Sequence, residues 1–377
     1  MTSEIREFQV FVKPAGARCN LSCSYCYYLD KGFLNPGSPS GCMNDEVLEL
    51  YIRQHIEATT GREIIFSWHG GEPTLAGLEF FRKAIRYQKK YKPADRVIIN
   101  GIQTNATLLT EEWGIFLKQE NFFAGVSLDG PEKYHNLLRR DRHHKLTYQR
   151  VLRGLEIIRK HEIPFEILVV ISDANVHAPL ELYHFLKETG AAYVTFLPLV
   201  EKDASGVQAV SPRSVRPSDF GRFLAAVFDE WLEKDIGAVK VQIFEEALRD
   251  AFNQEHTLCI FRKECGAVPV VEMNGDFYSC DHYVDPEHQI GNIGEISLAE
   301  MLDDPRQRTF GQSKRTALPR YCLDCEVLSM CNGECPKNRF MVTPAGEEGL
   351  NYLCEGYRYF FNHCRPFIGE VARLWKM

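Results

Sequence analysis

The chain has 377 residues, of which 45% are hydrophobic and 25% charged, with a formal net charge of -7. It is long enough to bury a large core and exceeds one average domain. We find no secretory pattern at the N-terminus and no apolar run of about eighteen residues, so we expect a cytoplasmic protein without membrane segments, and the scattered basic residues predict no nucleic-acid partner.

The first two hundred residues alternate predicted strands with predicted helices. Apolar runs that end in polar residues or glycine predict strands at 8–14, 63–71, 96–105, 122–130, 165–172 and 193–200. Amphipathic stretches at 44–60, 78–91, 110–120, 148–162 and 178–189 predict helices, with start signals at Asn44, Thr110 and Asn175 or its neighbours. Repeated βα units imply parallel strands, so we expect an α/β barrel or part-barrel with its chemistry at the C-terminal strand ends.

A further helix is predicted at 217–234, and the composition changes soon after it. Nine of the thirteen cysteines lie between Cys259 and Cys364, among short predicted strands and many turns. We therefore divide the chain into an α/β domain at 1–240 and a cysteine-rich domain at 241–377. In a long intracellular chain, metal ligation explains many cysteines better than disulfides do.

The stretch "CNLSCSYCYY" at 19–28 places Cys19, Cys23 and Cys26 directly after the first predicted strand. Three thiolates hold three irons of a [4Fe-4S] cluster and leave the fourth iron open to another ligand. The alternatives are a thioredoxin-type CxxC motif, which needs only two cysteines, and a zinc site, for which Cys42 is a candidate fourth ligand.

The second motif is "GGEP" at 70–73, after the second predicted strand. Gly70 and Gly71 allow a ligand to approach the backbone closely, while Glu72 offers a carboxylate to an ammonium group. CxxxCxxC with an aromatic residue before its last cysteine, followed by GGEP, resembles the radical S-adenosylmethionine (SAM) superfamily. That resemblance implies a partial (β/α)6 barrel in which SAM binds the open iron and yields a 5'-deoxyadenosyl radical on one-electron reduction.

The same resemblance implies which side chains face SAM. They are Tyr25, Gly70, Gly71, Glu72, Pro73, Ser127, Arg139 and Leu197. Ser127, in the strand end "SLDG", has the alternative role of a satisfied turn residue.

The C-terminal cysteines resemble the SPASM extension of radical SAM enzymes, which holds two auxiliary [4Fe-4S] clusters. The resemblance assigns Cys259, Cys265, Cys280 and Cys335 to the first auxiliary cluster, and Cys322, Cys325, Cys331 and Cys354 to the second. With the N-terminal cluster this makes three. Two structural zinc sites with four cysteines each remain the alternative.

Longer stretches, among them "VFVKPAGARCNLSCSYCYYL", "WHGGEPTLAGLEFF" and "LNYLCEGYRYFFNH", resemble the anaerobic sulfatase-maturating enzymes over nearly the whole chain. This resemblance implies oxidation of a cysteine or serine in a CxPxR- or SxPxR-type sulfatase motif to Cα-formylglycine. An electron donor such as flavodoxin or ferredoxin is implied as a second partner. The alternatives are thioether formation or epimerisation of a peptide, and a non-catalytic metal-binding module.

By the same resemblance Asp281, directly after Cys280 in "SCDHY", is the base that takes the substrate proton. A general base needs to lie within hydrogen-bond reach of that proton, and the adjacent cluster ligand would fix its place. The alternatives are that Asp281 only caps a turn and that His282 is the base, because histidine titrates near neutrality. Tyr28 and His69, which flank the two SAM motifs, are candidates for contact with the target peptide or for packing.

Overall fold

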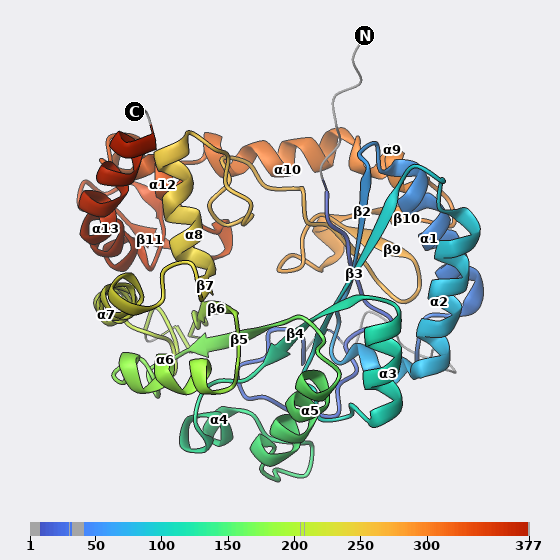
Figure 1. The fold of residues 1–377 in the computed structure, drawn as a ribbon. Helices are drawn as coiled ribbons and strands as arrows, with labels where there is room; N and C mark the ends of the chain where they lie inside the picture. The colour runs from blue at the N-terminus through green and yellow to red at the C-terminus, as the bar shows by residue number, and fades with distance from the viewer. Residues whose placement is uncertain (1–7, 30, 32–40, 204, 207, 376–377) are drawn as a thin grey trace. The chain divides into compact units, whose positions relative to one another are not determined.

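The computed structural model describes residues 8–29, 31, 41–203, 205–206 and 208–375, and they form two compact units (Figure 1). The first unit takes its residues from 1–127, 138–165 and 266–311, and the second from 128–137, 166–265 and 312–377. Both units combine segments from either side of residue 240. The division into domains at 1–240 and 241–377 separates two parts of the sequence, and these parts do not coincide with the two compact units. That division stays a prediction.

The first unit is built on a mostly parallel sheet with the strand order β10-β9-β8-β1-β2-β3-β4. Strands β1 to β4 run parallel, β8 pairs with β1 in parallel, and β8, β9 and β10 are joined by antiparallel pairings. The strands are β1 (Phe11–Val12), β2 (Glu63–Trp68), β3 (Val97–Thr104), β4 (Phe122–Ser127), β8 (Val270–Val271), β9 (Asp276–Tyr278) and β10 (Gln289–Asn292). The β8–β9 hairpin, which comes from the C-terminal part of the chain, therefore extends the sheet beside β1.

Helices α1 (Asp45–Ala58), α2 (Leu78–Tyr91) and α3 (Glu111–Gln119) connect the parallel strands β1 to β4 of the first unit. The same unit contains α5 (Tyr148–Lys160), which comes after β4 in the sequence, and α9 (Leu298–Leu302), which follows β10. The side chain of Asn44 caps α1 by accepting from Val47 N, and that of Thr110 caps α3 by accepting from Trp113 N. Helices α1 and α2 pack side by side (Figure 1).

The second unit has the parallel strand order β5-β6-β7, from β5 (Phe165–Ile171), β6 (Tyr193–Pro198) and β7 (Lys240–Val241), and a separate hairpin of β11 (Met341–Val342) and β12 (Glu348–Leu350). Its helices are α4 (Glu132–Leu138), α6 (Pro179–Glu188), α7 (Pro217–Lys234), α8 (Gln242–Arg249), α11 (Arg320–Leu323), α12 (Leu328–Cys331) and α13 (Cys354–Trp375), and α10 (Pro305–Thr316) continues into it from the first unit. Helices α7 and α13 lie side by side (Figure 1). Their buried aromatic residues, such as Phe220 against Tyr357, form the core between them.

The structure confirms all six strands and the six helices expected from the sequence. One start signal was wrong: Ala178 precedes α6 as its N-cap, whereas Asn175 accepts from Ser172 N and donates to Val170 O in the preceding turn. Strand β1 is shorter than the expected 8–14. Within the described ranges, none of the helices combines the length and apolar character that crossing a membrane requires.

Candidate active site

The GGEP loop after β2 lies directly against the loop after β1 in the first unit. Gly71 N donates to Gly16 O at 2.8 Å, and Glu72 N donates to Arg18 O at 2.8 Å. A Cβ atom on Gly71 would stand 2.2 Å from Arg18 O, and one on Gly70 would stand 2.8 Å from Gly16 O. Glycine is therefore required at both positions because the two motif loops are in close contact. From the sequence we had expected the glycines to make room for a ligand instead.

The carboxylate of Glu72 is buried and fixes this loop against the end of β3. Its Oε1 accepts from Thr74 N at 3.1 Å and from the hydroxyls of Thr74 and Thr104 at 2.6 and 2.7 Å. Its Oε2 accepts from Asn105 N at 2.8 Å. Burial raises the pKa of Glu72, against the effect of these four hydrogen bonds. The contacts support a structural role for the side chain, and its contact with the SAM ammonium stays a prediction.

The three N-terminal cysteines lie in the loop after β1. Leu21 N donates to Cys19 Sγ at 3.3 Å, and Cys26 N donates to Cys23 O at 3.0 Å. The thiol of Cys19 is electrostatically coupled to those of Cys23 and Cys26, and burial raises its pKa to about 12. Because a cluster binds thiolates, such a buried thiol needs the positive charge of metal to ionise, and the three close cysteines fit an iron–sulfur cluster as its ligands.

Two of the residues expected to face SAM are hydrogen-bonded to each other. Arg139 Nη1 donates to the Tyr25 hydroxyl at 2.7 Å. Ser127, at the end of β4, accepts from Gln103 Nε2 at 3.1 Å, which joins the ends of β3 and β4. Leu197 lies on β6 of the second unit with 38% of its surface exposed. The structure thus places Tyr25, Arg139 and Ser127 in the unit that holds GGEP, and contact of these residues with SAM stays a prediction.

Asp281 meets Lys13 in the first unit, because β1 and the β8–β9 hairpin are neighbours in the sheet. Lys13 follows β1, is 1% exposed, and donates from Nζ to Asp281 Oδ1 at 2.5 Å. The Tyr27 hydroxyl donates to Oδ2 of the same carboxylate. Lys13 Nζ also lies 4.5 Å from the centre of the Tyr28 ring. Both carboxylate oxygens of Asp281 are therefore held in place.

The charges around Asp281 keep it ionised. Burial alone would raise its pKa, but the Lys13 ammonium, with a smaller effect from His282, outweighs burial and lowers the pKa to about 2. Burial and the charge of Lys13 lower the pKa of His69 to about 3, so His69 is neutral at pH 7. A carboxylate with a pKa near 2 is ready to accept a proton at neutral pH but holds it weakly.

The two residues proposed for peptide contact are both engaged within the protein. The His69 ring stacks on Phe11 with 3.8 Å between the ring centres. Tyr28 is 2% exposed, donates its hydroxyl to Glu272, and packs with Val270 in a core cluster. These contacts support the packing alternative for Tyr28.

Lys13 and Tyr27 were not among the site residues predicted from the sequence. Lys13 carried a signal, since it is a charged residue at the C-terminal end of a predicted strand, where active-site groups gather in barrels. Tyr27 lies directly after Cys26, and its phenol is electrostatically coupled to both Cys26 and Cys280. Tyr27 comes near ligands of two expected clusters only in the folded chain, so the spacing of residues along the sequence could not predict its position.

The expected ligands of the second auxiliary cluster lie together in the second unit. Cys322, Cys325, Cys331 and Cys354 line one cavity. Their thiols are electrostatically coupled to one another, and burial raises the pKa of each. Four thiols around one cavity fit a fully ligated [4Fe-4S] cluster.

The other expected set is divided between the units. Cys259 and Cys265 are coupled to each other in the second unit, which also contains Cys335, whereas Cys280 belongs to the first. The grouping of all four stays a prediction. In the part of the chain that the structure describes, no three His, Cys, Asp or Glu side chains are grouped closely enough to hold a single metal ion. The ligands of a four-iron cluster lie farther apart than those of a single ion, and it is for such a cluster that we compare these cysteines.

Two family models match the chain: the radical SAM superfamily at residues 14–186 and an iron–sulfur cluster-binding domain, SPASM, at residues 259–326. They confirm the expected α/β radical SAM fold with its SPASM domain, and they establish iron–sulfur clusters as cofactors. The alternative of zinc sites alone is thereby set aside.

Characterised relatives cover almost the whole chain. A serine-type anaerobic sulfatase-maturating enzyme of Bacteroides thetaiotaomicron is 42% identical, over 97% of this chain and 91% of its own length. A cysteine-type enzyme of Clostridium perfringens is 32% identical, over 96% and 98%. The solved structure "Native anSMEcpe with bound AdoMet and Cp18Cys peptide" matches with a TM-score of 0.87 and 31% identity, over 97% and 98% of the two chains. The chain therefore belongs to the anaerobic sulfatase-maturating enzymes, a family of radical SAM oxidoreductases.

Proposed function

We propose that this chain oxidises a cysteine or serine of a sulfatase polypeptide to Cα-formylglycine, with Asp281 accepting the substrate proton. Formylglycine generation follows from membership of the family, whose relatives at 42% and 32% identity are serine-type and cysteine-type sulfatase-maturating enzymes. A related structure with bound AdoMet and peptide supports a peptide substrate, for which we propose a CxPxR- or SxPxR-type motif. The observation that carries the role of Asp281 is its buried, ionised carboxylate, held between Lys13 and Tyr27.

The reaction balances as a two-electron oxidation. Cys19, Cys23 and Cys26 would hold the cluster at which SAM binds, and the bound SAM would supply the radical chemistry that removes a hydrogen atom from the peptide Cβ. Asp281 takes the proton of the hydroxyl or thiol, and the second electron would pass to an auxiliary cluster held by the C-terminal cysteines, so a carbon–oxygen or carbon–sulfur double bond forms. Serine then gives the aldehyde directly, whereas the thioaldehyde from cysteine is hydrolysed by water with release of hydrogen sulfide.

Residues of the first unit prepare this proton transfer. Lys13 holds Asp281 ionised and Tyr27 fixes its second oxygen, so the carboxylate has one orientation before substrate arrives. Tyr25, Arg139, Ser127 and the GGEP loop are the proposed SAM contacts from this unit, and Leu197 is the proposed contact from the second. A one-electron carrier, flavodoxin or ferredoxin, is the proposed reductant.

Replacement of the base tests the assignment. We expect Asp281→Asn to lower the rate of peptide oxidation by about a hundredfold or more, because general-base catalysis contributes about 10²–10⁴. Cleavage of SAM by a chemical reductant is expected to remain, because the cluster cysteines and SAM contacts are unchanged. Both rates are measured on the same anaerobic preparation by chromatography of 5'-deoxyadenosine and mass spectrometry of the peptide.

His282→Gln is the matched variant, since it removes the neighbouring titratable group and leaves Asp281 in place. We expect it to retain peptide oxidation. A fully active Asp281→Asn protein would remove Asp281 from the role, and loss of activity in His282→Gln alone would transfer that role to His282.

A further inference from the structure

Two buried cations, Lys314 and Arg339, lie among the cysteines of the second unit. The side chain of Lys314, near the end of α10, has no exposed surface. Its Nζ donates to Cys259 O at 2.9 Å, Ile260 O at 2.7 Å and Arg262 O at 2.5 Å. These three carbonyl acceptors match the three N–H donors of an ammonium group, against the effect of burial, which lowers the pKa of Lys314.

Arg339 is anchored in the same way, on backbone carbonyls. It donates to Gly333 O from Nε at 2.8 Å, to Lys314 O from Nη1 at 2.5 Å, and to Asn332 O and Glu334 O from Nη2 at 2.9 and 3.2 Å. These bonds use the planar fork of the guanidinium for positioning. The charge itself remains available to act on neighbouring groups.

These two charges act on cysteines from the predicted ligand sets of both auxiliary clusters. Lys314 is electrostatically coupled to Cys259 and Cys265. Arg339 is coupled to Cys265 of that set and to Cys322 and Cys331 of the other. One guanidinium therefore acts on both sets of ligands.

A carboxylate partly offsets the two cations. Glu334 is 3% exposed and its Oε2 accepts from Asn338 Nδ2 at 3.1 Å and Asn351 Nδ2 at 2.6 Å. It is coupled to Lys314 and Arg339. Other charges also act on these cysteines: Arg262 on Cys259, and Arg358, Glu326 and Glu347 on the set of Cys322, Cys325 and Cys354.

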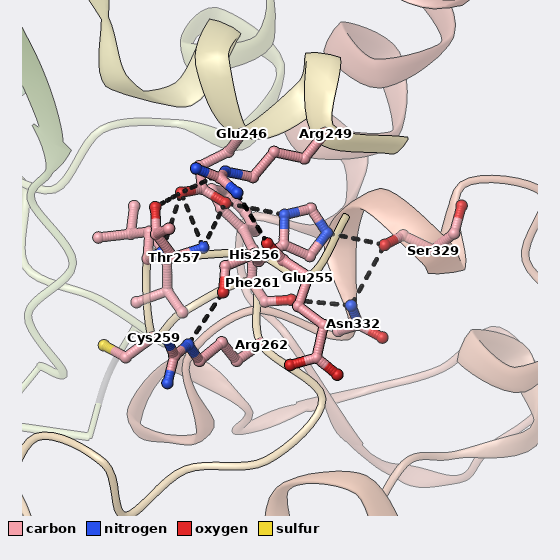
Figure 2. Close-up of polar contacts among 12 residues, drawn as sticks. Glu246, Arg249, Glu255, His256, Thr257, Cys259, Phe261, Arg262, Ser329 and Asn332 are labelled. Carbon is pink, nitrogen blue, oxygen red and sulfur yellow. Dashed lines mark hydrogen bonds and ion pairs between the residues drawn. The ribbon is translucent and has the colours of Figure 1, made fainter. Parts of the chain in front are cut away.

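The loop that carries Cys259 is also held by hydrogen bonds to Glu246 and His256 (Figure 2). Buried Glu246 accepts from Leu258 N at 2.9 Å and from the Thr257 hydroxyl, and it bonds His256 Nδ1 at 2.8 Å. Arg262 Nε donates to His256 O at 2.9 Å. Arg262 in this network also acts electrostatically on Cys259, whereas the Thr257 hydroxyl holds the same loop and carries no charge, so Thr257 offers the control.

We propose that Lys314 and Arg339 are positioning residues that raise the reduction potentials of the two auxiliary clusters, with Arg339 acting on both. Thiolate ligands concentrate negative charge in a buried site, and reduction of a cluster adds one more negative charge. A fixed cation stabilises the reduced form more than the oxidised form, and net charge is one of the determinants of cluster potential. The proposal rests on the loading of both clusters, and it does not depend on which peptide the enzyme oxidises.

The test compares Arg339→Met with Arg339→Lys in the cluster-loaded protein, by potentiometric titration followed by electron paramagnetic resonance without peptide. We expect Arg339→Met to make both auxiliary clusters about tenfold harder to reduce, a shift of about -59 mV for one electron. Arg339→Lys keeps the charge and loses the fork, so we expect it to restore most of the potential. The cluster of Cys19, Cys23 and Cys26 serves as an internal reference that does not shift.

Lys314→Met is expected to shift the cluster of Cys259 and Cys265 more than the other. Thr257→Val is the matched control, because it removes a hydroxyl bond from the Cys259 loop and no cation. We expect its potentials to equal those of the unchanged protein. If Arg339→Met fails to take up iron, uptake by Arg339→Lys supports a role of charge, and failure of both variants contradicts it.

Equal potentials in Arg339→Met and the unchanged protein would overturn the proposal. Equal shifts in Arg339→Met and Arg339→Lys would also overturn it, because the effect would then lie in packing. Because no peptide is present, these outcomes are independent of whether formylglycine is formed.

Discussion

The Lys13–Asp281 pair shows at the residue scale how the protein keeps a buried carboxylate charged. The Lys13 side chain is 1% exposed and that of Asp281 11%, so neither charge is well solvated. The attraction between the two charges offsets the free-energy cost of burying them, and removal of one partner leaves the other charge buried without compensation. The pair is therefore weak evidence for high stability but strong evidence for a fixed position.

We expect Lys13→Met to lower the free energy of unfolding at pH 7 by about 3–5 kcal/mol, the usual cost of breaking a buried ion pair from one side. The pKa of folded Asp281 lies at about 2, below the value of about 3.9 in unfolded chains. The stability contributed by the pair is thus present above about pH 4 and is lost as the pH falls toward 2. Denaturant unfolding of the anaerobic protein at several pH values measures both effects.

The double variant Lys13→Met with Asp281→Asn is the control. A neutral amide needs no buried cation, so we expect the double variant to be more stable than Lys13→Met alone. Additive losses would show that the two side chains do not interact.

The roles of individual residues could be predicted only where a local sequence motif indicates them. Cysteine spacing predicted the N-terminal ligand set, whereas the two auxiliary ligand sets and the role of Asp281 were predicted from resemblance. The partners Lys13 and Tyr27 could not be found this way, because Lys13 and Asp281 are 268 positions apart and meet through strand pairing. Local spacing carries no record of such contacts.

At the scale of elements, the contact between the GGEP loop and the cysteine loop sets the geometry of the site. Their backbones are joined by hydrogen bonds of Gly71 to Gly16 and of Glu72 to Arg18. The glycines were predicted to matter, but the reason became visible only when β1 and β2 were seen as neighbours. Helices and strands were predicted well because their apolar periodicity is local, whereas the N-cap at Ala178 lacks any side-chain signal.

We expect Gly71→Ala to push these two loops apart, because the new Cβ would stand 2.2 Å from Arg18 O. The N-terminal cluster is expected to be lost selectively, so that iron falls from about twelve to about eight atoms per chain if three [4Fe-4S] clusters are bound. Cleavage of SAM is lost with it. Iron analysis and the 5'-deoxyadenosine assay measure the two results.

Gly369→Ala is the matched control, since a Cβ at Gly369 in α13 meets no atom within 4 Å. We expect unchanged iron and a small gain of stability, up to about 1 kcal/mol, because alanine favours helix over glycine. Gly71→Ala protein that keeps its iron and cleaves SAM would contradict the account of the two loops.

At the scale of the whole molecule, the chain combines an open set of three cysteines with eight further cysteines assigned to closed sets. The open set lies in the first unit beside GGEP, and one closed set lies around a single cavity in the second unit. The α/β and SPASM classes could be predicted from motifs, because cysteine spacing and GGEP are compact in sequence. The interleaving of C-terminal residues 266–311 with the first unit could not be predicted, since composition marks domains only along the chain.

The mass of the product tests formylglycine generation most directly. The enzyme is incubated anaerobically with SAM, a reductant and a CxPxR-type peptide, and the peptide mass is then measured. We expect a loss of about 18 Da for cysteine and about 2 Da for the matched serine peptide, because oxidation removes two hydrogens and hydrolysis exchanges sulfur for oxygen. A loss of about 2 Da from the cysteine peptide would indicate a thioether, and an unchanged mass with SAM consumed would indicate epimerisation or no peptide reaction; either result would contradict the assigned function.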